Sequence, residues 1–149
     1  MVMTNEPTSQ EAITRLEREL DVSFPREYVE FLLDQNGGLP RSGVFTFDDN
    51  RSSVSFFGAY TGHDYNDVGE AARMYAGRLP SEFVPVGDDP GGNVVALAVD
   101  GADRGSIWFW DHENESADGV PTRDNMYKLA STLSEFIASL TLDPSADWA

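Results

Sequence analysis

The sequence predicts an α+β fold in which helices cover a mostly antiparallel sheet. Apolar residues recur at helical spacing in four segments of the chain, and they alternate or cluster as in strands in five others. Turns that contain glycine or proline separate most of the strands and leave no room for crossover helices. The expected order of elements, ααββαβββα, lacks regular β–α–β alternation and therefore favours antiparallel over parallel pairing.

Two short helices are expected near the N-terminus. The first begins at Thr8, because Thr8 and Glu11 have the spacing of a capping box. The second begins at Pro25, since proline suits the first turn of a helix, and it ends at the Asn-Gly-Gly sequence of residues 36–38. Their apolar faces consist of Ile13, Leu16, Leu20, Tyr28, Phe31 and Leu32. Each helix buries one face and therefore needs a sheet to pack on.

A hairpin followed by a helix is expected in the middle of the chain. Residues 44–48 and 53–60 alternate and are rich in aromatic and β-branched residues, and Asp49 and Asn50 form a turn signal between them. Residues 64–79 then fit a helix. The apolar side of this helix is formed by Val68, Ala71, Ala72, Tyr75 and Leu79.

Three more strands are expected to form an antiparallel meander, because glycine-rich turns follow one another closely. These strands are residues 83–86, 94–99 and 106–110. On the last of them, Trp108 and Trp110 share one face and Phe109 lies on the other.

The final helix is expected over residues 126–140, where apolar residues fall on one helical face. They are Met126, Leu129, Ala130, Leu133, Phe136, Ile137 and Leu140. A chain of 149 residues normally forms one domain. We therefore expect a single domain over residues 1–149, with a flexible N-terminus at 1–7 and an acidic C-terminal tail at 143–149.

The composition excludes several classes of protein. The chain has no cysteine, and its 26 acidic and 10 basic side chains give a formal net charge of −16. Without cysteine there are no disulfides, thiolate metal sites or thiol chemistry. An acidic surface repels phosphate and anionic lipid, so direct binding to nucleic acid or membrane is not expected. Residues 1–7 show no signal-peptide pattern, and the longest apolar run, 94–99, is too short for a bilayer, so we expect a cytoplasmic protein.

The acidic residues are distributed unevenly. Residues 48–149 carry 18 acidic and 6 basic groups, a net of −12, whereas residues 1–47 carry 8 and 4, a net of −4. Most of the acids in the longer part lie in expected loops. A compositional bias of the source lineage accounts for the total charge equally well, but the distribution indicates the loops as the place to look for a partner.

The sequence contains few of the residue patterns that are typical of enzymes. There is no nucleophile elbow, zinc-binding histidine pair, Walker loop or dinucleotide-binding turn. A metal site would have to combine His63 or His112 with nearby acids, but neighbours on a strand point to opposite faces, which disfavours convergence at residues 111–113. Residues 88–93 fit a tight turn better than a phosphate loop, because no lysine follows them. The residues alone therefore give an enzyme no support, and they indicate neither a metal nor a cofactor.

Three blocks of sequence carry a family resemblance. Residues 13–40 contain a helix, a proline, an aromatic pair and a terminal Asn-Gly-Gly, with Phe24 in place of the usual leucine before the proline. Residues 83–113 contain Pro-Val-Gly, Gly-Gly-Asn and a strand that ends in Trp-Asp-His-Glu, and residues 125–137 contain a Leu-Ala-x-x-Leu-x-x-Phe-Ile pattern. In this order the blocks resemble the SUKH superfamily, which includes bacterial immunity proteins and fungal cell-wall synthesis regulators of the SMI/KNR type. The positions that match its opening signature are Pro25, Tyr28, Phe31, Leu32, Asn36, Gly37 and Gly38.

The resemblance implies a SUKH-like α+β fold and a function without catalysis. Bacterial members are typically antitoxins encoded beside polymorphic or contact-dependent toxins, which are often nucleases or deaminases. Fungal members act as scaffolds in cell-wall and stress signalling. The matched residues are mostly glycine, proline and core apolar residues, so they indicate the fold and not the partner.

Charge and resemblance together predict a monomeric immunity protein that masks the basic active surface of a cognate toxin with acidic loops. The predicted partner-binding residues are Asp48, Asp49, Tyr60, Asp64, Asp67, Asp88, Asp89, Trp110, Asp111, Glu113, Glu115 and Asp118. Two alternatives stay open: a non-enzymatic adaptor or signalling scaffold on the same fold, and a metal-dependent hydrolase built around the two histidines and the loop carboxylates.

Overall fold

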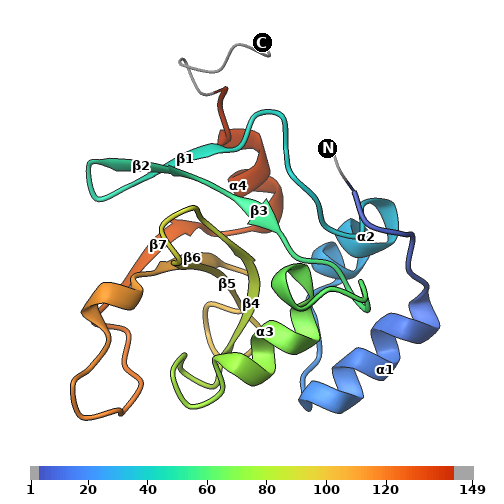
Figure 1. Cartoon of the computed structure of the whole chain (residues 1–149), viewed down its shortest axis with the longest axis horizontal. Coiled ribbons are helices and arrows are strands. Elements are labelled where there is room, and N and C mark those ends of the chain that lie inside the picture. Colours follow the sequence, from blue (N-terminus) through green and yellow to red (C-terminus); the bar gives the residue numbers. More distant parts are fainter. Residues whose placement is uncertain (1–3, 143–149) are drawn as a thin grey trace.

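The computed structural model describes residues 4–142 and confirms the α+β class (Figure 1). In that range the chain forms a five-stranded antiparallel sheet in the order β3-β4-β5-β6-β7, a separate β1-β2 hairpin and four α-helices. The elements in chain order are α1 (Gln10–Leu20), α2 (Arg26–Asp34), β1 (Val44–Phe47), β2 (Asn50–Ser53), β3 (Ser55–Phe56), the 3-10 turn η1 (Asp64–Asn66), α3 (Val68–Met74), β4 (Phe83–Asp88), β5 (Val94–Ala98), β6 (Ile107–Trp110), the 3-10 turn η2 (His112–Asn114), β7 (Met126–Ala130) and α4 (Leu133–Ser139). The expected acidic tail at 143–149 and the first three residues of the expected flexible N-terminus lie outside the described residues.

The five-stranded sheet buries both of its faces. In β5 and β6, successive side chains point alternately into two different cores. On one face Leu97 and Phe109 join the main core, to which all four helices contribute. On the other face Ala96 and Trp110 belong to a smaller core that lies beneath the segment following α3. Trp108 packs against this second core, so the prediction that Trp108 and Trp110 share a face is confirmed.

The two N-terminal helices form close to where the sequence predicts them. The N-cap of α1 is Ser9 and not Thr8, because the Ser9 hydroxyl accepts a hydrogen bond from the Ala12 N–H at 3.1 Å. The helix α2 begins at Arg26, one residue after the predicted start, with Pro25 as its N-cap, and it ends at Asp34 with Gln35 as its C-cap.

The β1-β2 hairpin turns one residue earlier than predicted. Asp48 and Asp49 form the turn with φ values of 44° and 64°, and Asn50 already pairs with Phe47. Aspartate tolerates this left-handed backbone better than most residues, which explains the position of the turn. The single strand expected over 53–60 is wrong, because β2 ends before Val54 and β3 contains two residues.

The helix expected over residues 64–79 is shorter and starts later. Asp67 separates η1 from α3, and its carboxylate accepts hydrogen bonds from the Glu70 N–H at 3.0 Å and the Thr61 N–H at 2.9 Å. Asp67 is therefore the N-cap of α3, and it also ties the preceding loop to that helix.

The helix expected over residues 126–140 is wrong for its first part. Residues 126–130 form β7, which pairs with β6 and completes the sheet. The helix α4 begins only after Thr132, whose hydroxyl accepts a hydrogen bond from the Glu135 N–H at 3.0 Å. The apolar residues of the whole segment fit a helical period, but pairing with β6 overrides that local pattern. The order of elements therefore gains a strand before α4.

The Asn-Gly-Gly sequence after α2 joins the helices to the sheet. Asn36 is 4% exposed, and its side chain both donates to the Ala59 carbonyl at 3.0 Å and accepts from the Ala59 N–H at 2.8 Å. The backbones meet so closely here that a Cβ on Gly37 would lie 2.5 Å from the Phe57 carbonyl, and one on Gly58 would collide with the Asn36 carbonyl oxygen. Glycine is required at both positions by this approach.

We expect Gly37→Ala to destabilise the fold much more than Gly62→Ala. Both glycines have left-handed φ values, 77° and 80°, but a Cβ on Gly62 meets no other atom within 4 Å. Gly62→Ala should therefore lower the free energy of unfolding by about 1 kcal/mol, because alanine disfavours the left-handed backbone conformation. Gly37→Ala adds a clash with the Phe57 backbone and should lower it by about 3 kcal/mol or more. Urea unfolding of the two variants measures the difference, and equal losses would contradict the importance of this junction.

Candidate partner-binding surface

The antiparallel register brings two loops together at one end of the sheet, and the tip of the β1-β2 hairpin is attached beside them. Ser55 pairs with Asp88, Asp88 with Val94, Val94 with Trp110, and Trp110 with Met126. Consecutive antiparallel strands reverse direction, so the β4-β5 turn and the connection that follows β6 must lie together. The hairpin belongs to the separate β1-β2 sheet and joins them through a hydrogen bond from Ser52 to Asp89. We call this surface the acidic loop edge; it comprises residues 48–52 of the β1-β2 hairpin, the β4-β5 turn at 88–93, and residues 111–115 after β6.

Hydrogen bonds connect the β4-β5 turn to the loops on either side of it. The Ser52 hydroxyl donates to the Asp89 carboxylate at 2.7 Å, which ties the hairpin to the turn. On the other side, the His112 N–H donates to the Asn93 side-chain oxygen at 3.1 Å, and the His112 ring nitrogen Nε2 lies 2.8 Å from the Gly91 carbonyl oxygen. The three loops therefore form one hydrogen-bonded surface.

Several predicted acids at the edge are occupied by structural contacts. The Asp89 carboxylate accepts from the backbone N–H groups of Gly91 and Asn93 at 3.0 and 2.8 Å and so shapes the turn. Asp111 accepts from the Glu113 N–H at 3.0 Å and caps η2. Glu115 forms an ion pair with Arg78 at 2.6 Å, and this hydrogen bond holds the pKa of Glu115 below its usual range.

Other acids of the edge carry free carboxylates. Asp48 and Asp49 at the hairpin tip and Glu113 in η2 are exposed, and none of the three side chains accepts a hydrogen bond from another described residue. Asp118 lies farther along the same connection, where its carboxylate accepts from the Ser116 hydroxyl and from the Val120 N–H at 2.9 Å. The free negative charge is thus concentrated on the hairpin tip and on η2.

Two predicted residues are corrected by their burial. Trp110 is 1% exposed and packs its ring against Tyr75 at a centroid distance of 5.5 Å, so it is a core residue and not a surface anchor. Asp67 is 7% exposed, and both of its oxygens are used in capping α3. In both cases the sequence indicates the chemistry of the side chain but not the loop or helix that covers it.

Tyr60 and Asp64 are exposed but lie away from the acidic loop edge. In Figure 1 the segment between β3 and α3 that carries them is beside α1 and α2, on the opposite side of the molecule from the hairpin tip and η2. Tyr60 has a left-handed φ of 51°, and the Arg15 guanidinium lies over its ring at 4.5 Å. The twelve predicted residues therefore do not form one surface.

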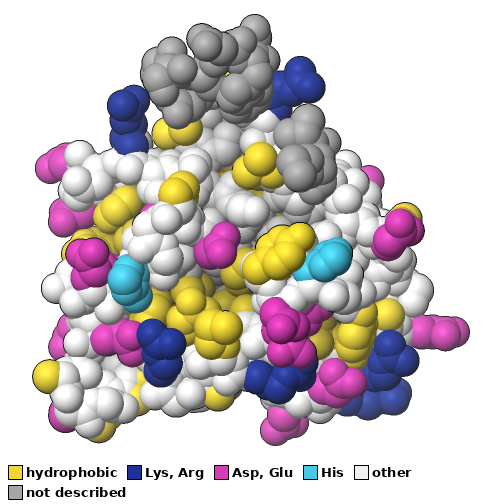
Figure 2. Space-filling model, viewed as in Figure 1, with side chains coloured by type: hydrophobic (Ala, Val, Ile, Leu, Met, Phe, Trp, Pro, Cys, Tyr) yellow, Lys and Arg dark blue, Asp and Glu magenta, His cyan; other side chains and the backbone are white. Residues whose placement is uncertain are grey.

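An exposed aromatic residue was missed by the sequence analysis. Tyr65 in η1 is 74% exposed and stacks on the His63 ring at a centroid distance of 5.4 Å. Its signal in the sequence is an aromatic residue inside the polar turn Gly-His-Asp-Tyr-Asn. Figure 2 shows hydrophobic side chains gathered across the middle of this face, with acidic, basic and histidine side chains around them.

Asp88 and Tyr75 connect the edge electrostatically to the end of α3. Partial burial, and secondly the neighbouring Asp89 carboxylate, raise the pKa of Asp88 to about 6. Burial also raises the pKa of Tyr75, and the charge of Asp88 acts in the same direction. Arg78 lies over the Tyr75 ring at 4.9 Å and over the Trp110 ring at 5.5 Å, so it places one positive charge beside these groups.

The described residues do not bring together the ligands that a metal centre needs. Within residues 4–142, no group of three or more histidine, aspartate and glutamate side chains could hold a metal ion. In Figure 2 the histidine side chains occupy separate parts of the visible face. None of the helices in the same range has the length and apolar character that crossing a bilayer requires.

We expect Asp88→Asn to stabilise the protein at neutral pH but not at pH 4. The pKa of Asp88 rises from an ordinary 3.8 to about 6 on folding, so between these values the folded state binds more protons than the unfolded state. Stability of the unaltered protein therefore falls as the pH rises through this window. Removing the charge should raise the free energy of unfolding by about 1 kcal/mol above pH 7, a value reduced for solvent screening.

Urea unfolding between pH 4 and pH 8 measures this effect. The matched control is Asp64→Asn, which removes the same charge from an exposed position in η1. A gain that is the same at pH 4 and pH 8, or a gain equal to that of the control, would show that charge burial at Asp88 is not the cause.

Comparisons with known proteins agree with this fold. The chain is 30% identical over 97 residues to the SPbeta prophage-derived uncharacterized protein YokK of Bacillus subtilis (strain 168). This match covers 65% of the chain but 45% of that protein, so the chain spans about half the length of its relative. Residues 7–139 match the profile of the SMI1/KNR4 family (SUKH-1), which confirms the resemblance seen in the sequence. The chain belongs to the SMI1/KNR4 family (SUKH-1).

Proposed function

We propose that this protein is a cytoplasmic immunity protein that binds a cognate toxin through the acidic loop edge and masks the toxin's basic active surface. The observation that carries the proposal is the set of free carboxylates of Asp48, Asp49 and Glu113 on loops that hydrogen bonds hold in place. Family membership supports it, because bacterial SUKH proteins are typically antitoxins. The match to a prophage-derived protein of Bacillus subtilis is consistent with such a role.

The charge of the edge suits a partner that works on nucleic acid. A nuclease or deaminase needs a basic surface to hold a phosphate backbone, and an acidic protein surface is complementary to it. The net charge of −16 attracts such a toxin over a long range, which raises the rate of association at low salt. Nucleic acid itself is repelled by the same field, so the surface discriminates between the enzyme and its substrate.

The hydrogen bonds of the edge prepare it for binding. Asp89 holds the β4-β5 turn, and Ser52 and His112 attach the neighbouring loops to it. Loops that are already ordered lose little conformational entropy when a partner binds. Repulsion among the clustered carboxylates raises the free energy of the unbound surface, and a basic partner relieves that repulsion.

We expect removal of the three free charges to slow association with the toxin. The variant is Asp48→Asn, Asp49→Asn and Glu113→Gln; asparagine also tolerates the left-handed backbone at 48 and 49, so the hairpin should keep its turn. The partner for this measurement is a toxin-like domain, to be sought in the reading frame beside that of this protein. At low salt the association rate constant should fall about 10-fold, and the difference should shrink as the salt concentration rises.

The matched control removes the same number of charges from exposed positions on α1 and α2, through Glu11→Gln, Glu30→Gln and Asp34→Asn. It should change the rate less than about 2-fold. Equal effects of the two variants, or a rate independent of salt, would contradict the assignment of the binding surface. In the cell, co-expression of the unaltered protein should restore growth, and continued killing despite soluble protein would favour the adaptor role instead.

A further inference from the structure

Residues 60–66, which we call the tyrosine loop, present two exposed aromatic rings. Tyr65 is 74% exposed and stacks on His63, so most of its ring faces solvent. Tyr60 is exposed as well, and the Arg15 guanidinium lies over its ring and donates from Nε to its hydroxyl at 3.3 Å. Tyrosine and arginine are enriched among the residues that dominate the binding energy of protein interfaces.

The tyrosine loop is held in place by its own polar groups. The Thr61 N–H donates to the Asp67 carboxylate at 2.9 Å, and the Thr61 hydroxyl donates to the Asn66 side-chain oxygen at 2.7 Å. The Asn66 side chain donates in turn to Asn5 at 3.0 Å. Tyr60 keeps a left-handed φ of 51°, a conformation that is unfavourable for tyrosine and that proteins retain most often at functional positions. The rings are therefore ordered in advance, which lowers the entropy lost on binding.

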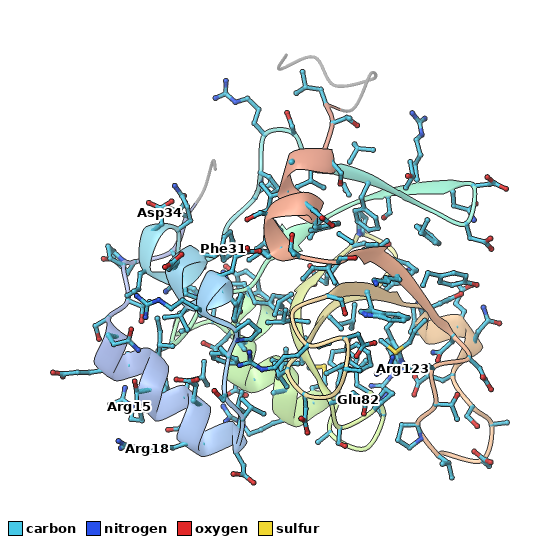
Figure 3. The ribbon with its side chains drawn as sticks, turned by 180° about the vertical axis from the view of Figure 1, so that it is seen from behind. Arg15, Arg18, Phe31, Asp34, Glu82 and Arg123 are labelled. Carbon is cyan, nitrogen blue, oxygen red and sulfur yellow. The ribbon has the colours of Figure 1, made fainter. Side chains whose placement is uncertain are left out.

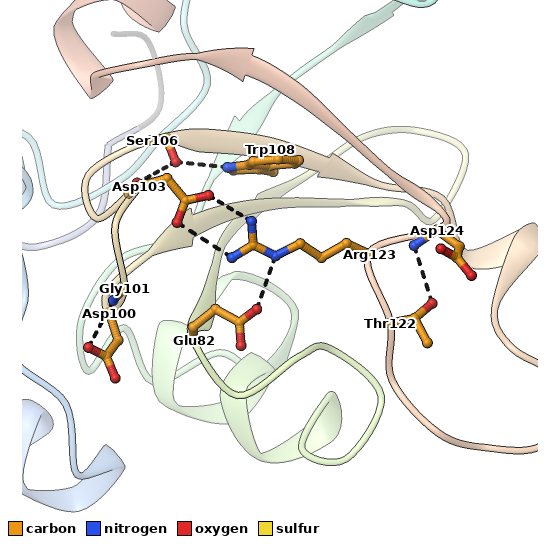
Figure 4. A network of polar contacts seen from close by, with 9 residues as sticks. All are labelled: Glu82, Asp100, Gly101, Asp103, Ser106, Trp108, Thr122, Arg123 and Asp124. Atoms are coloured by element: carbon orange, nitrogen blue, oxygen red, sulfur yellow. Dashed lines mark hydrogen bonds and ion pairs between the residues drawn. The ribbon is translucent and has the colours of Figure 1, made fainter.

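Trp108 shows the contrast with an aromatic residue that serves the fold (Figure 4). It is half-buried, its Nε1 donates to the Ser106 hydroxyl at 2.8 Å, and the Arg123 guanidinium lies over its ring at 5.1 Å. Arg123 is itself held by Asp103 and Glu82 at 2.7 and 3.1 Å. Contacts within the molecule thus use the Trp108 side chain, whereas the tyrosine loop leaves its rings exposed.

Helix α3 lies between the tyrosine loop and the acidic loop edge. The turn η1 comes directly before the helix, and beyond its other end Arg78 pairs with Glu115, next to η2, at 2.6 Å. The seven residues of α3 span about 10 Å, and Met74 among them is 59% exposed.

Both loops border one face of the molecule. In Figure 2 the histidine side chains stand on either side of a gathering of hydrophobic side chains. The two histidines of the chain are His63, in the tyrosine loop, and His112, in the acidic loop edge. A protein interface of ordinary size, about 800 Å² on each partner, is wide enough to reach both loops across α3.

The charges of this face suit a basic partner. The carboxylates on it outnumber the cations, and they are Asp48, Asp49, Asp64, Glu70, Asp88, Asp89, Asp111, Glu113 and Glu115 against Arg15, Arg18, Arg51, Arg73 and Arg78. Figure 3 shows Arg15 and Arg18 on α1, at the side of the molecule away from η2. The negative charge is therefore concentrated at the acidic loop edge, and the tyrosine loop offers mainly ring surface.

We propose that one toxin domain contacts both loops at once, with its basic surface on the acidic loop edge and apolar or cationic side chains packed on Tyr60 and Tyr65. This inference rests on the proposed function, because it names the place where the same partner is held most tightly. The charges of the edge speed association, whereas short-range packing on the tyrosine loop slows dissociation. Tyrosine rings accept the arginine and lysine side chains of a basic partner as well as apolar ones.

Single substitutions at the tyrosine loop test this contact with the toxin domain. Tyr65→Ala should raise the dissociation rate constant about 30-fold and change the association rate constant less than about 2-fold. Tyr65→Phe keeps the ring and should raise the dissociation rate constant less than about 3-fold. The matched control is Ile137→Ala, an exposed apolar position on α4, which should change neither rate. Thermal unfolding verifies that each variant is folded, and amide hydrogen exchange in the complex should slow at 60–66 as well as at 111–115.

The possible results separate this inference from the proposed function. A complex whose dissociation is unchanged by Tyr65→Ala, with exchange slowed only at the acidic loop edge, would overturn the tyrosine-loop contact and leave the proposed function in place. An equal rise in the dissociation rate for Ile137→Ala would do the same. A complex that responds to Tyr65→Ala but not to loss of the Asp48, Asp49 and Glu113 charges would overturn the contact with both loops. The absence of any complex would overturn the proposed function, and this inference with it.

Discussion

The architecture depends on the junction between Asn36 and Ala59. The buried side-chain amide of Asn36 makes three hydrogen bonds, two with the backbone groups of Ala59 and one that it donates to the Glu6 carbonyl. The backbone carbonyl of Asn36 accepts a fourth from the Asn5 side chain. Leaving any of these groups unpaired in the interior would be costly. The junction attaches the N-terminal segment and the end of α2 to the chain between β3 and α3, and so positions the helices over the main core.

The sheet explains why part of the acidic charge gathers at one end of the molecule. Antiparallel pairing places alternate connections at the same end, where the β4-β5 turn and the connection after β6 are rich in aspartate and glutamate, and the acidic tip of the separate hairpin is attached to them by Ser52. Much of that charge is stabilised locally, since backbone N–H groups donate to Asp89 and Asp111. The remaining carboxylates face solvent, where a basic partner can reach them.

Two arginines of this acidic chain, Arg78 and Arg123, combine an ion pair with packing on aromatic rings. The rings belong to the smaller core. Both hold the long connection between β6 and β7 against that face, Arg78 through Glu115 and Arg123 from within the connection itself. These ion pairs therefore fix the start and the end of that connection.

Short-range patterns in the sequence determined a large part of this protein. The two N-terminal helices and the alternation of Trp108, Phe109 and Trp110 depend on local periodicity and capping. The loops that carry the acids were also evident. The family followed from three motifs made of such local features.

The tertiary structure decided what depends on contacts between distant residues. Residues 126–130 have the apolar spacing of a helix and became β7 because β6 offered a partner for their backbone. Trp110 was covered by Tyr75, and Asp67 was used to cap α3, so neither remained available at the surface. The register of the sheet brought the β4-β5 turn and η2 together, and the hydrogen bond from Ser52 to Asp89 attached the hairpin to them. Tyr60 and Asp64 lie elsewhere, because no single segment of the sequence specifies which strands and loops become its neighbours.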